Sequence, residues 1–186
     1  MATIRPGNRS ALLVVDVQVG VVDGAWDTPR VVANVARTVE RARAEGVPVF
    51  WVQHHDEDLP KDSPAWQWVP QLVPAEGEQR IHKQYNSAFE ATPLAGALDA
   101  LGTTHIVLAG AATNWCIRAT AYGALERGYD LTLVADAHTT KPLQVEGGQA
   151  VPAANIVHDL NTAIQWLAYP GRRNSCDTVD QLQFAR

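Results

Sequence analysis

The sequence predicts an α/β fold with three layers, α/β/α, built around a doubly wound and mostly parallel sheet that carries helices on both faces. Four short apolar runs rich in β-branched residues are typical of strands buried on both faces. Helical patterns alternate with these runs, and this alternation is typical of right-handed βαβ crossovers. The four predicted strands are residues 11–18, 47–54, 105–110 and 131–138.

The first two predicted helices are recognised by their end signals. The segments 28–46 and 92–102 both open with a threonine followed by a proline and close with a glycine. Thr28 and Thr92 are therefore the expected N-caps, because a threonine hydroxyl satisfies a free backbone N–H and a proline fits the first turn.

Two more helices follow along the chain. One is expected to open near Cys116 and to end at Gly128, and the last covers 152–168. The proline-rich connection 55–82 is long and contains two tryptophans, which indicates a lid or a pocket wall. No element is predicted for the polar tail after 168.

Composition narrows the class of protein. Of the 186 residues 46% are hydrophobic, which is enough for one substantial core, so we expect a single domain over 1–186. The net charge of −5 and the scattered basic residues argue against nucleic acid as a partner. No apolar segment resembles a signal peptide or a membrane span, so we expect a cytoplasmic protein that does not bind membranes, with Cys116 and Cys176 reduced.

Ligands bind parallel sheets of this kind at the carboxyl edge of the strands. Polar residues follow each predicted strand, and they are Asp16 and Gln18, His54 and His55, Cys116, and Asp136 with His138. The topology is expected to gather them on one rim.

Cys116 is the candidate nucleophile of this rim. A thiol at a helix N-terminus feels the positive end of the helix dipole, which favours the thiolate. The alternative is a small residue buried in the core, and the residues alone leave both open. Asp16 has two possible roles as well: it either pairs with a cation in the site or caps a neighbouring turn. An isolated lysine such as Lys83 is usually solvated.

The combination of three segments is more specific than any single residue. "ALLVVDVQ", "HKQYNSAFEATPL" and "GAATNWCIRATAYGALERGYDLTLVADAH" occur in an order and spacing that resemble the isochorismatase-like cysteine hydrolases. That family includes nicotinamidases and N-carbamoylsarcosine amidohydrolases. The resemblance extends from residue 10 to about 165, and it implies a catalytic triad of Asp16, Lys83 and Cys116.

The resemblance also implies how the triad works. A cis peptide is expected between Ala111 and Ala112, and the N–H groups of Ala112 and Cys116 would form the oxyanion hole. Asp16 would act as the base, and Lys83 would stabilise the thiolate. The expected activity is hydrolysis of a small carboxamide, ureido compound or lactam through a thioester, with no cofactor. The segment "GAATNWCIR" is also similar to relatives that open a lactam in streptothricin-type antibiotics.

Several further side chains are candidates for contact with a small-molecule substrate. They are Gln18, His54, Trp66, Phe89 and Trp115. For the aromatic ones, packing in the core or at an interface is the alternative. Asn114 is expected to cap the helix, His55 to be exposed, and Cys176 to have no role.

No metal site is expected. Nicotinamidases carry an Asp-x-His pair after the second strand, whereas this chain has His54 and His55 side by side. Neighbouring residues of an extended chain point to opposite faces, so the two histidines make a poor chelating pair.

Two rival functions fit the sequence less well. A catalytically idle binding or subunit-interaction module of the same fold is disfavoured by the intact Asp16, Lys83 and Cys116. A flavodoxin-like or dinucleotide-binding domain is disfavoured because no G-x-G-x-x-G follows the first strand. The resemblance further implies a homo-oligomer, either a dimer or a tetramer.

Overall fold

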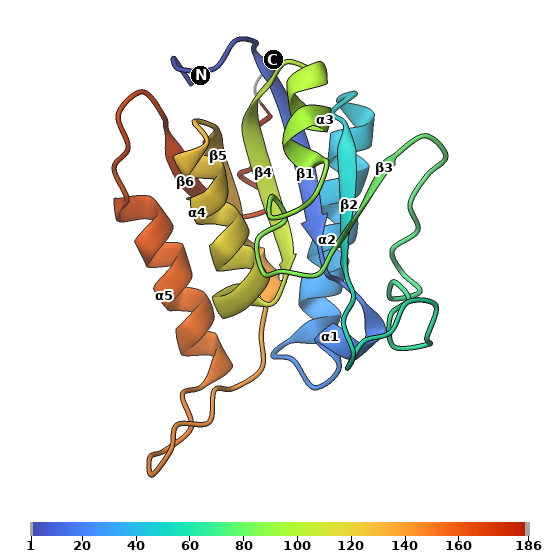
Figure 1. The fold of residues 1–186 in the computed structure, drawn as a ribbon. Helices are drawn as coiled ribbons and strands as arrows, with labels where there is room; N and C mark the ends of the chain where they lie inside the picture. Colours follow the sequence, from blue (N-terminus) through green and yellow to red (C-terminus); the bar gives the residue numbers. More distant parts are fainter. Residues whose placement is uncertain (1, 185–186) are drawn as a thin grey trace.

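Six parallel strands form one sheet in the computed structural model, which describes residues 2–184 (Figure 1). The strand order is β3-β2-β1-β4-β5-β6, and every neighbouring pair is parallel. This confirms the predicted fold class. The strands are β1 (Arg9–Val15), β2 (Val49–His54), β3 (Gln79–Lys83), β4 (Thr103–Ala111), β5 (Asp130–Thr139) and β6 (Asn174–Asp177).

The two edge strands, β3 and β6, are not predicted from the sequence. β3 exposes three of its five residues, and all four residues of β6 are half-buried. An edge strand with one wet side does not need a continuous apolar run. β3 nevertheless matters for the site, because it is the element that carries Lys83.

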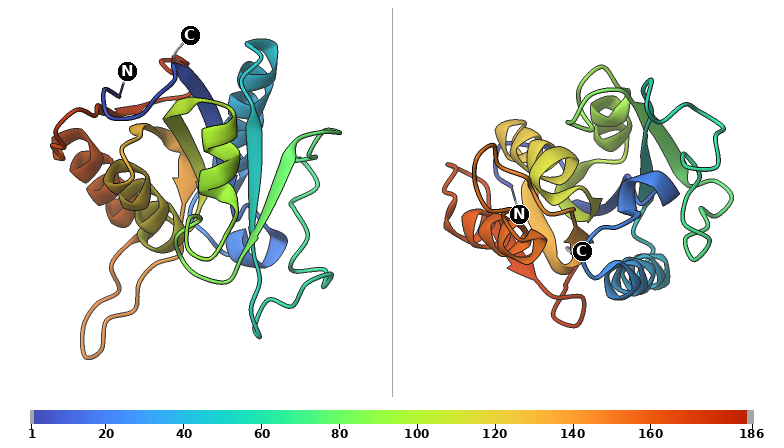
Figure 2. Two further views of the ribbon diagram at one scale, coloured as in Figure 1. Left: turned by 45° about the horizontal axis from the view of Figure 1, so that its top comes forward. Right: turned by 90° about the horizontal axis from the view of Figure 1, so that it is seen from below.

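Helices cover both faces of the sheet (Figure 1). The long helix α2 packs on one face of the sheet, and α3, α4 and α5 pack on the opposite face (Figures 1 and 2). The helices are α1 (Val19–Val22), α2 (Thr28–Ala44), α3 (Leu94–Ala100), α4 (Arg118–Glu126) and α5 (Ala153–Trp166).

Of the two predicted N-caps, the one at Thr28 is wrong. Thr28 is the first residue of α2, and its hydroxyl donates to the carbonyls of Val22 and Ala25. Thr92 precedes α3 by two residues, and its hydroxyl donates to the Ala88 carbonyl. The Thr28 hydroxyl is thus used by the backbone that comes before α2 and does not cap that helix. Thr92 Oγ1 also accepts from the N–H of Leu94, the first residue of α3, at 3.3 Å, so it satisfies a free N–H of that helix as predicted.

Strand alternation divides the interior into two cores. Leu13 and Val15 of β1 pack with α3, α4 and α5, whereas Leu12 and Val14 pack with α2. All four side chains are fully buried. Burying one side chain of this size contributes roughly 1.5–3 kcal/mol, so each of these four residues stabilises the fold substantially.

The chain reverses its winding between β1 and β4, and this places the switch point at the carboxyl ends of these two strands. Gly110 of β4 approaches β1 very closely there. Its φ is +129°, and a Cβ at this position would lie 1.9 Å from the Val15 carbonyl oxygen. Only glycine allows this contact, which sets the direction in which the chain leaves β4.

The connection between β5 and α5 projects from the body of the protein at the carboxyl edge (Figures 1 and 2). Its two sides are joined by an antiparallel bridge between Leu143 and Val151. Over residues 2–184, no helix combines the length and the apolar character needed to cross a membrane.

Candidate active site

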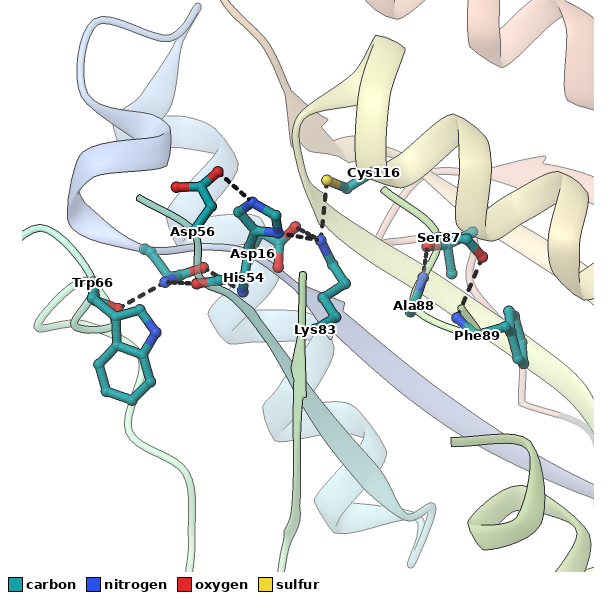
Figure 3. A network of polar contacts seen from close by, with 11 residues as sticks. Asp16, His54, Asp56, Trp66, Lys83, Ser87, Ala88, Phe89 and Cys116 are labelled. Carbon is teal, nitrogen blue, oxygen red and sulfur yellow. Dashed lines mark hydrogen bonds and ion pairs between the residues drawn. The ribbon is translucent and has the colours of Figure 1, made fainter. Parts of the chain in front are cut away.

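Three strand ends bring Asp16, Lys83 and Cys116 together (Figure 3). Asp16 is the residue directly after β1, and Lys83 is the last residue of β3. Cys116 lies in a single π-helical turn, η1 (Thr113–Ile117), that joins β4 to α4. Because all these strands are parallel, their carboxyl ends share one edge of the sheet.

The Lys83 ammonium group is the centre of the site. Its Nζ lies 2.7 Å from Asp16 Oδ2, 3.2 Å from Cys116 Sγ and 3.3 Å from His54 Nδ1. An ammonium group has three N–H donors and no acceptor, so these three partners match its full capacity. The side chains of Lys83 and Asp16 are 0% and 1% exposed, which removes competing water.

Burial and the neighbouring charges determine the direction in which the pKa values of Lys83 and Asp16 are shifted. Burial, the largest single influence, lowers the pKa of Lys83, but Asp16 and Cys116 together outweigh it, so the pKa of Lys83 is raised and the ammonium stays charged. Burial raises the pKa of Asp16 against the opposing effect of Lys83. A carboxylate with a raised pKa is a better proton acceptor than an exposed one.

Burial opposes the effect that the helix dipole was expected to have on the Cys116 thiol. Burial, and next to it the Asp16 carboxylate, raise the pKa of the Cys116 thiol to about 12, although Lys83 acts in the opposite direction. The thiol is only 9% exposed, and removal from water disfavours its anion. The structure therefore places the thiol beside a carboxylate that can take its proton.

His54 supports the lysine. Lys83 can only donate, so His54 Nδ1 accepts, and the His54 Nε2–H donates to Asp56 Oδ2 at 2.8 Å. This hydrogen bond is the main reason why the pKa of Asp56 is lowered. Asp56 was not predicted as a site residue, although its position two residues after His54 at a strand end was the available signal. His55 is half-buried rather than exposed as expected.

Gln18 is completely buried, and its amide joins two neighbouring segments. The Nε2 atom donates to the carbonyls of His54 and Trp66, while the Oε1 atom accepts from the His54 backbone N–H. These bonds occupy the polar atoms of Gln18 that were expected to meet a substrate. Gln18 thus holds the backbone of His54 in place.

The turn before the nucleophile has the backbone shape predicted for it. The peptide bond between Ala111 and Ala112 is cis. The Ala112 carbonyl accepts from the N–H groups of Trp115 and Ile117, so the turn is closed by its own backbone. Asn114 does not cap the helix as expected, because its Oδ1 accepts from the Thr140 hydroxyl at 2.6 Å.

A cavity of about 260 Å³ opens beside this turn. Trp115 lies on its wall and is 53% exposed, which leaves its ring free for a substrate. Lys141 is the charged residue of the lining. The residues around the cavity are Gly20, Val21, Ala112, Asn114, Trp115, Thr140, Lys141, Pro142 and Leu143. Residues 140–143 were not predicted, although they directly follow a strand that ends at the site.

A larger apolar cavity of about 810 Å³ lies between α2 and the segment 64–71. Asp16, Lys83 and Cys116 are not among the lining residues of either cavity, but the smaller one is lined by Ala112, Asn114 and Trp115 of the turn that carries Cys116. The larger cavity is lined by no residue of that turn, so we do not assign the reaction to it.

Two predicted aromatic contacts take other positions. Phe89 is a core residue, 6% exposed, with its ring stacked on Tyr129 at 5.9 Å, and the prediction that it contacts substrate is wrong. Trp66 stacks on His82 at 5.6 Å and lies beyond His54 from the thiol (Figure 3).

Metal ligands are not grouped in the part of the chain that the structure describes. Within residues 2–184, no three His, Cys, Asp or Glu side chains are close enough together to hold a metal ion. His54, the nearest candidate, already bonds to Lys83 and Asp56. The residues present therefore do not fit a metal centre.

Comparison with known proteins gives a consistent picture. A model of the isochorismatase domain matches residues 10–148. A streptothricin hydrolase from Streptomyces noursei is 36% identical over 162 residues, which cover 82% of this chain but 63% of the relative. An N-carbamoylsarcosine amidase from Arthrobacter sp is 30% identical over 154 residues, which cover 66% of this chain and 56% of the relative. The chain thus matches less than two thirds of the length of either protein.

The solved structures agree with the sequence relatives. The crystal structure of an isochorismatase from Pseudomonas putida KT2440 superimposes with a TM-score of 0.82 at 29% identity. The match covers 94% of this chain and 91% of that chain.

Proposed function

The chain belongs to the isochorismatase family of hydrolases, and from this premise we propose that it is a cysteine-dependent amidohydrolase with Asp16, Lys83 and Cys116 as its triad. Its substrate is a small carboxamide, ureido compound or lactam. The names of two relatives, a streptothricin hydrolase and an N-carbamoylsarcosine amidase, support this class. No cofactor is part of the proposal.

One observation carries the proposal. The Lys83 ammonium group lies 2.7 Å from Asp16 and 3.2 Å from the Cys116 sulfur, in a buried site next to an open cavity. Burying a charged pair costs several kcal/mol per ion, which a merely structural cysteine would not require. A base, a cation and a thiol at these distances are the groups that activate a sulfur nucleophile.

The first half of the reaction follows from these positions. The Cys116 sulfur attacks the amide carbon while its proton passes to Asp16, and the positive charge of Lys83 stabilises the sulfur as it becomes anionic. The carbonyl oxygen becomes an oxyanion that accepts hydrogen bonds from the N–H groups of Ala112 and Cys116. Each such donor contributes about 3–4 kcal/mol in acyl-transfer enzymes.

The second half releases the products. Collapse of the tetrahedral intermediate breaks the C–N bond, and the proton held by Asp16 moves to the leaving nitrogen. Water then attacks the thioester and gives its proton to Asp16, and this proton returns to the sulfur when the acid leaves. For a lactam the leaving amine stays attached to the acid, so no ammonia is released.

A panel of substrates tests the proposal. Ammonia release is measured with small amides, ureido acids and nicotinamide, and opening of a streptothricin lactam is followed by mass. Cys116→Ala is expected to abolish turnover, while the matched control Cys176→Ala retains it. A panel without turnover, together with a Cys116 that does not react with iodoacetamide, would instead support an idle binding module of the same fold.

The homo-oligomer, dimer or tetramer, stays part of the proposal. It rests on the resemblance to the family, because single exposed side chains such as Trp166 and Val73 are ordinary on a monomer. Sedimentation of the purified chain measures the number of subunits.

A further inference from the structure

A buried polar chain lies behind the nucleophile turn and takes no part in the proposed chemistry. His138 of β5 is completely buried, with its Nδ1 2.9 Å from the Thr113 hydroxyl and its Nε2 2.7 Å from Asn161 Oδ1. Asn161 lies on α5, and its Nδ2 donates to the Ala135 carbonyl at 3.0 Å. The chain thus joins η1, β5 and α5.

The direction of every hydrogen bond in this chain can be derived. Asn161 uses its NH₂ group on a carbonyl, which can only accept, so its Oδ1 faces His138 as an acceptor. The Nε2 of His138 must therefore carry the proton. Burial lowers the pKa of His138 to about 4, so the ring is neutral near pH 7 and its Nδ1 is a free acceptor. Thr113 must donate to it.

The Thr113 end of the chain reaches the turn that holds the thiol. Thr113 is the first residue of η1, three positions before Cys116, and it is completely buried. His138 stands in register with Gly110, directly across the sheet from the backbone that leads into the turn. The hydrogen bond from Thr113 to His138 Nδ1 therefore fixes the position of the start of η1 relative to β5.

We propose that His138 is a positioning residue of this hydrolase, which acts through the Thr113 hydroxyl to hold η1 so that the Cys116 sulfur stays within reach of Lys83 and Asp16. The role as positioning residue rests on the proposed function, but the placement of the thiol can be tested without any substrate. A misplaced nucleophile costs rate while substrate binding is kept, so kcat falls and KM does not.

Two substitutions of His138 test separately the hydrogen bond of Nδ1 to Thr113 and that of Nε2 to Asn161. His138→Asn places an amide near the Nδ1 position, where its oxygen can still accept from Thr113. His138→Gln places its amide near the Nε2 position, which serves Asn161 and leaves Thr113 without an acceptor. At the other end of the bond, Thr113→Ser keeps the hydroxyl and Thr113→Val removes it with little change in volume.

All variants are made in a Cys176→Ser background. Cys176 Sγ also donates to Asn161 Oδ1 at 3.2 Å, and serine keeps a donor there. The substitution also removes the second free thiol from the labelling experiment. The background itself is expected to keep the kcat of the unaltered chain.

The first measurement is the rate of alkylation of Cys116 by iodoacetamide as a function of pH. His138→Gln and Thr113→Val are expected to shift the midpoint of this profile, whereas His138→Asn and Thr113→Ser keep it. With a substrate from the panel, the same two disruptive variants are expected to lose about 10- to 100-fold in kcat at a constant KM.

The outcomes separate this proposal from the proposed function. If the variants unfold at lower urea but keep the alkylation profile and kcat, His138 serves stability alone and the positioning role is refuted. If His138→Asn behaves like His138→Gln, and Thr113→Ser like Thr113→Val, the hydrogen bond from Thr113 to His138 does not position the thiol. A shifted alkylation profile in a chain that hydrolyses no amide would uphold the placement of the thiol while refuting the proposed function.

Discussion

Two buried histidines predict a strong dependence of stability on pH. His105 and His138 are 7% and 0% exposed, and burial lowers the pKa of each from 6.5 to about 4. Between pH 6.5 and pH 4 each of these two rings is protonated in the unfolded chain but stays neutral in the folded protein. Stability therefore falls as the pH drops from 6.5, and the loss ends below about pH 4.

The magnitude follows from the two pKa values. A full difference of this size corresponds to roughly 3 kcal/mol per histidine, because one pKa unit is about 1.4 kcal/mol. Between pH 7 and pH 5 each ring contributes a loss of roughly 2 kcal/mol, so the pair contributes about 4 kcal/mol. Most carboxylates titrate below this window.

Urea unfolding at pH 7, 6 and 5 measures the effect. His105→Gln is expected to halve the loss between pH 7 and 5, because one of the two rings is removed. The exposed His158 provides the matched control, and His158→Gln is expected to keep the full loss. A His105→Gln variant that loses as much stability as the unaltered chain would refute the reasoning.

Three substitutions test other parts of the structure by urea unfolding. Lys83→Met leaves Asp16 buried without its partner and is expected to cost about 3–5 kcal/mol, so a loss below about 1 kcal/mol contradicts the buried pair. Trp51→Phe removes the indole N–H that donates to Glu78 Oε2 at 2.6 Å, with an expected cost of about 1.5–3 kcal/mol, and an unchanged midpoint would count against that bond. Gly110→Ala drives a Cβ into the Val15 backbone 1.9 Å away and is expected to cost more than about 4 kcal/mol, so a stable variant would refute the close approach.

The central strands could be predicted because they are buried on both faces. β1, β2, β4 and β5 leave continuous apolar runs, and short runs of this kind are typical of strands inside a parallel sheet. The edge strands have a wet side and no such run, so β3 and β6 could not be recognised. The role of Thr28 was mispredicted because the sequence does not show whether a threonine hydroxyl turns toward the helix or toward the preceding loop.

The sequence predicts which residues form the site but not the pKa values of their side chains. The spacing of the segments that contain Asp16, Lys83 and Cys116 carries the family resemblance, and the fold brings the three together. The state of the thiol depends on how deeply it is buried and on the carboxylate beside it, which no local pattern records. Phe89 was misassigned for a similar reason, because only the packed structure shows that its ring faces the core.

The central claim is that Cys116 forms a covalent bond with the substrate. The most direct test mixes the protein with a substrate from the panel, stops turnover with acid and determines the mass of the peptide that contains Cys116. We expect an acyl group of the mass of the substrate without its leaving amine on this peptide, and no adduct or turnover in Cys116→Ser. Undiminished turnover in Cys116→Ser, with no adduct on the unaltered chain, would contradict the account.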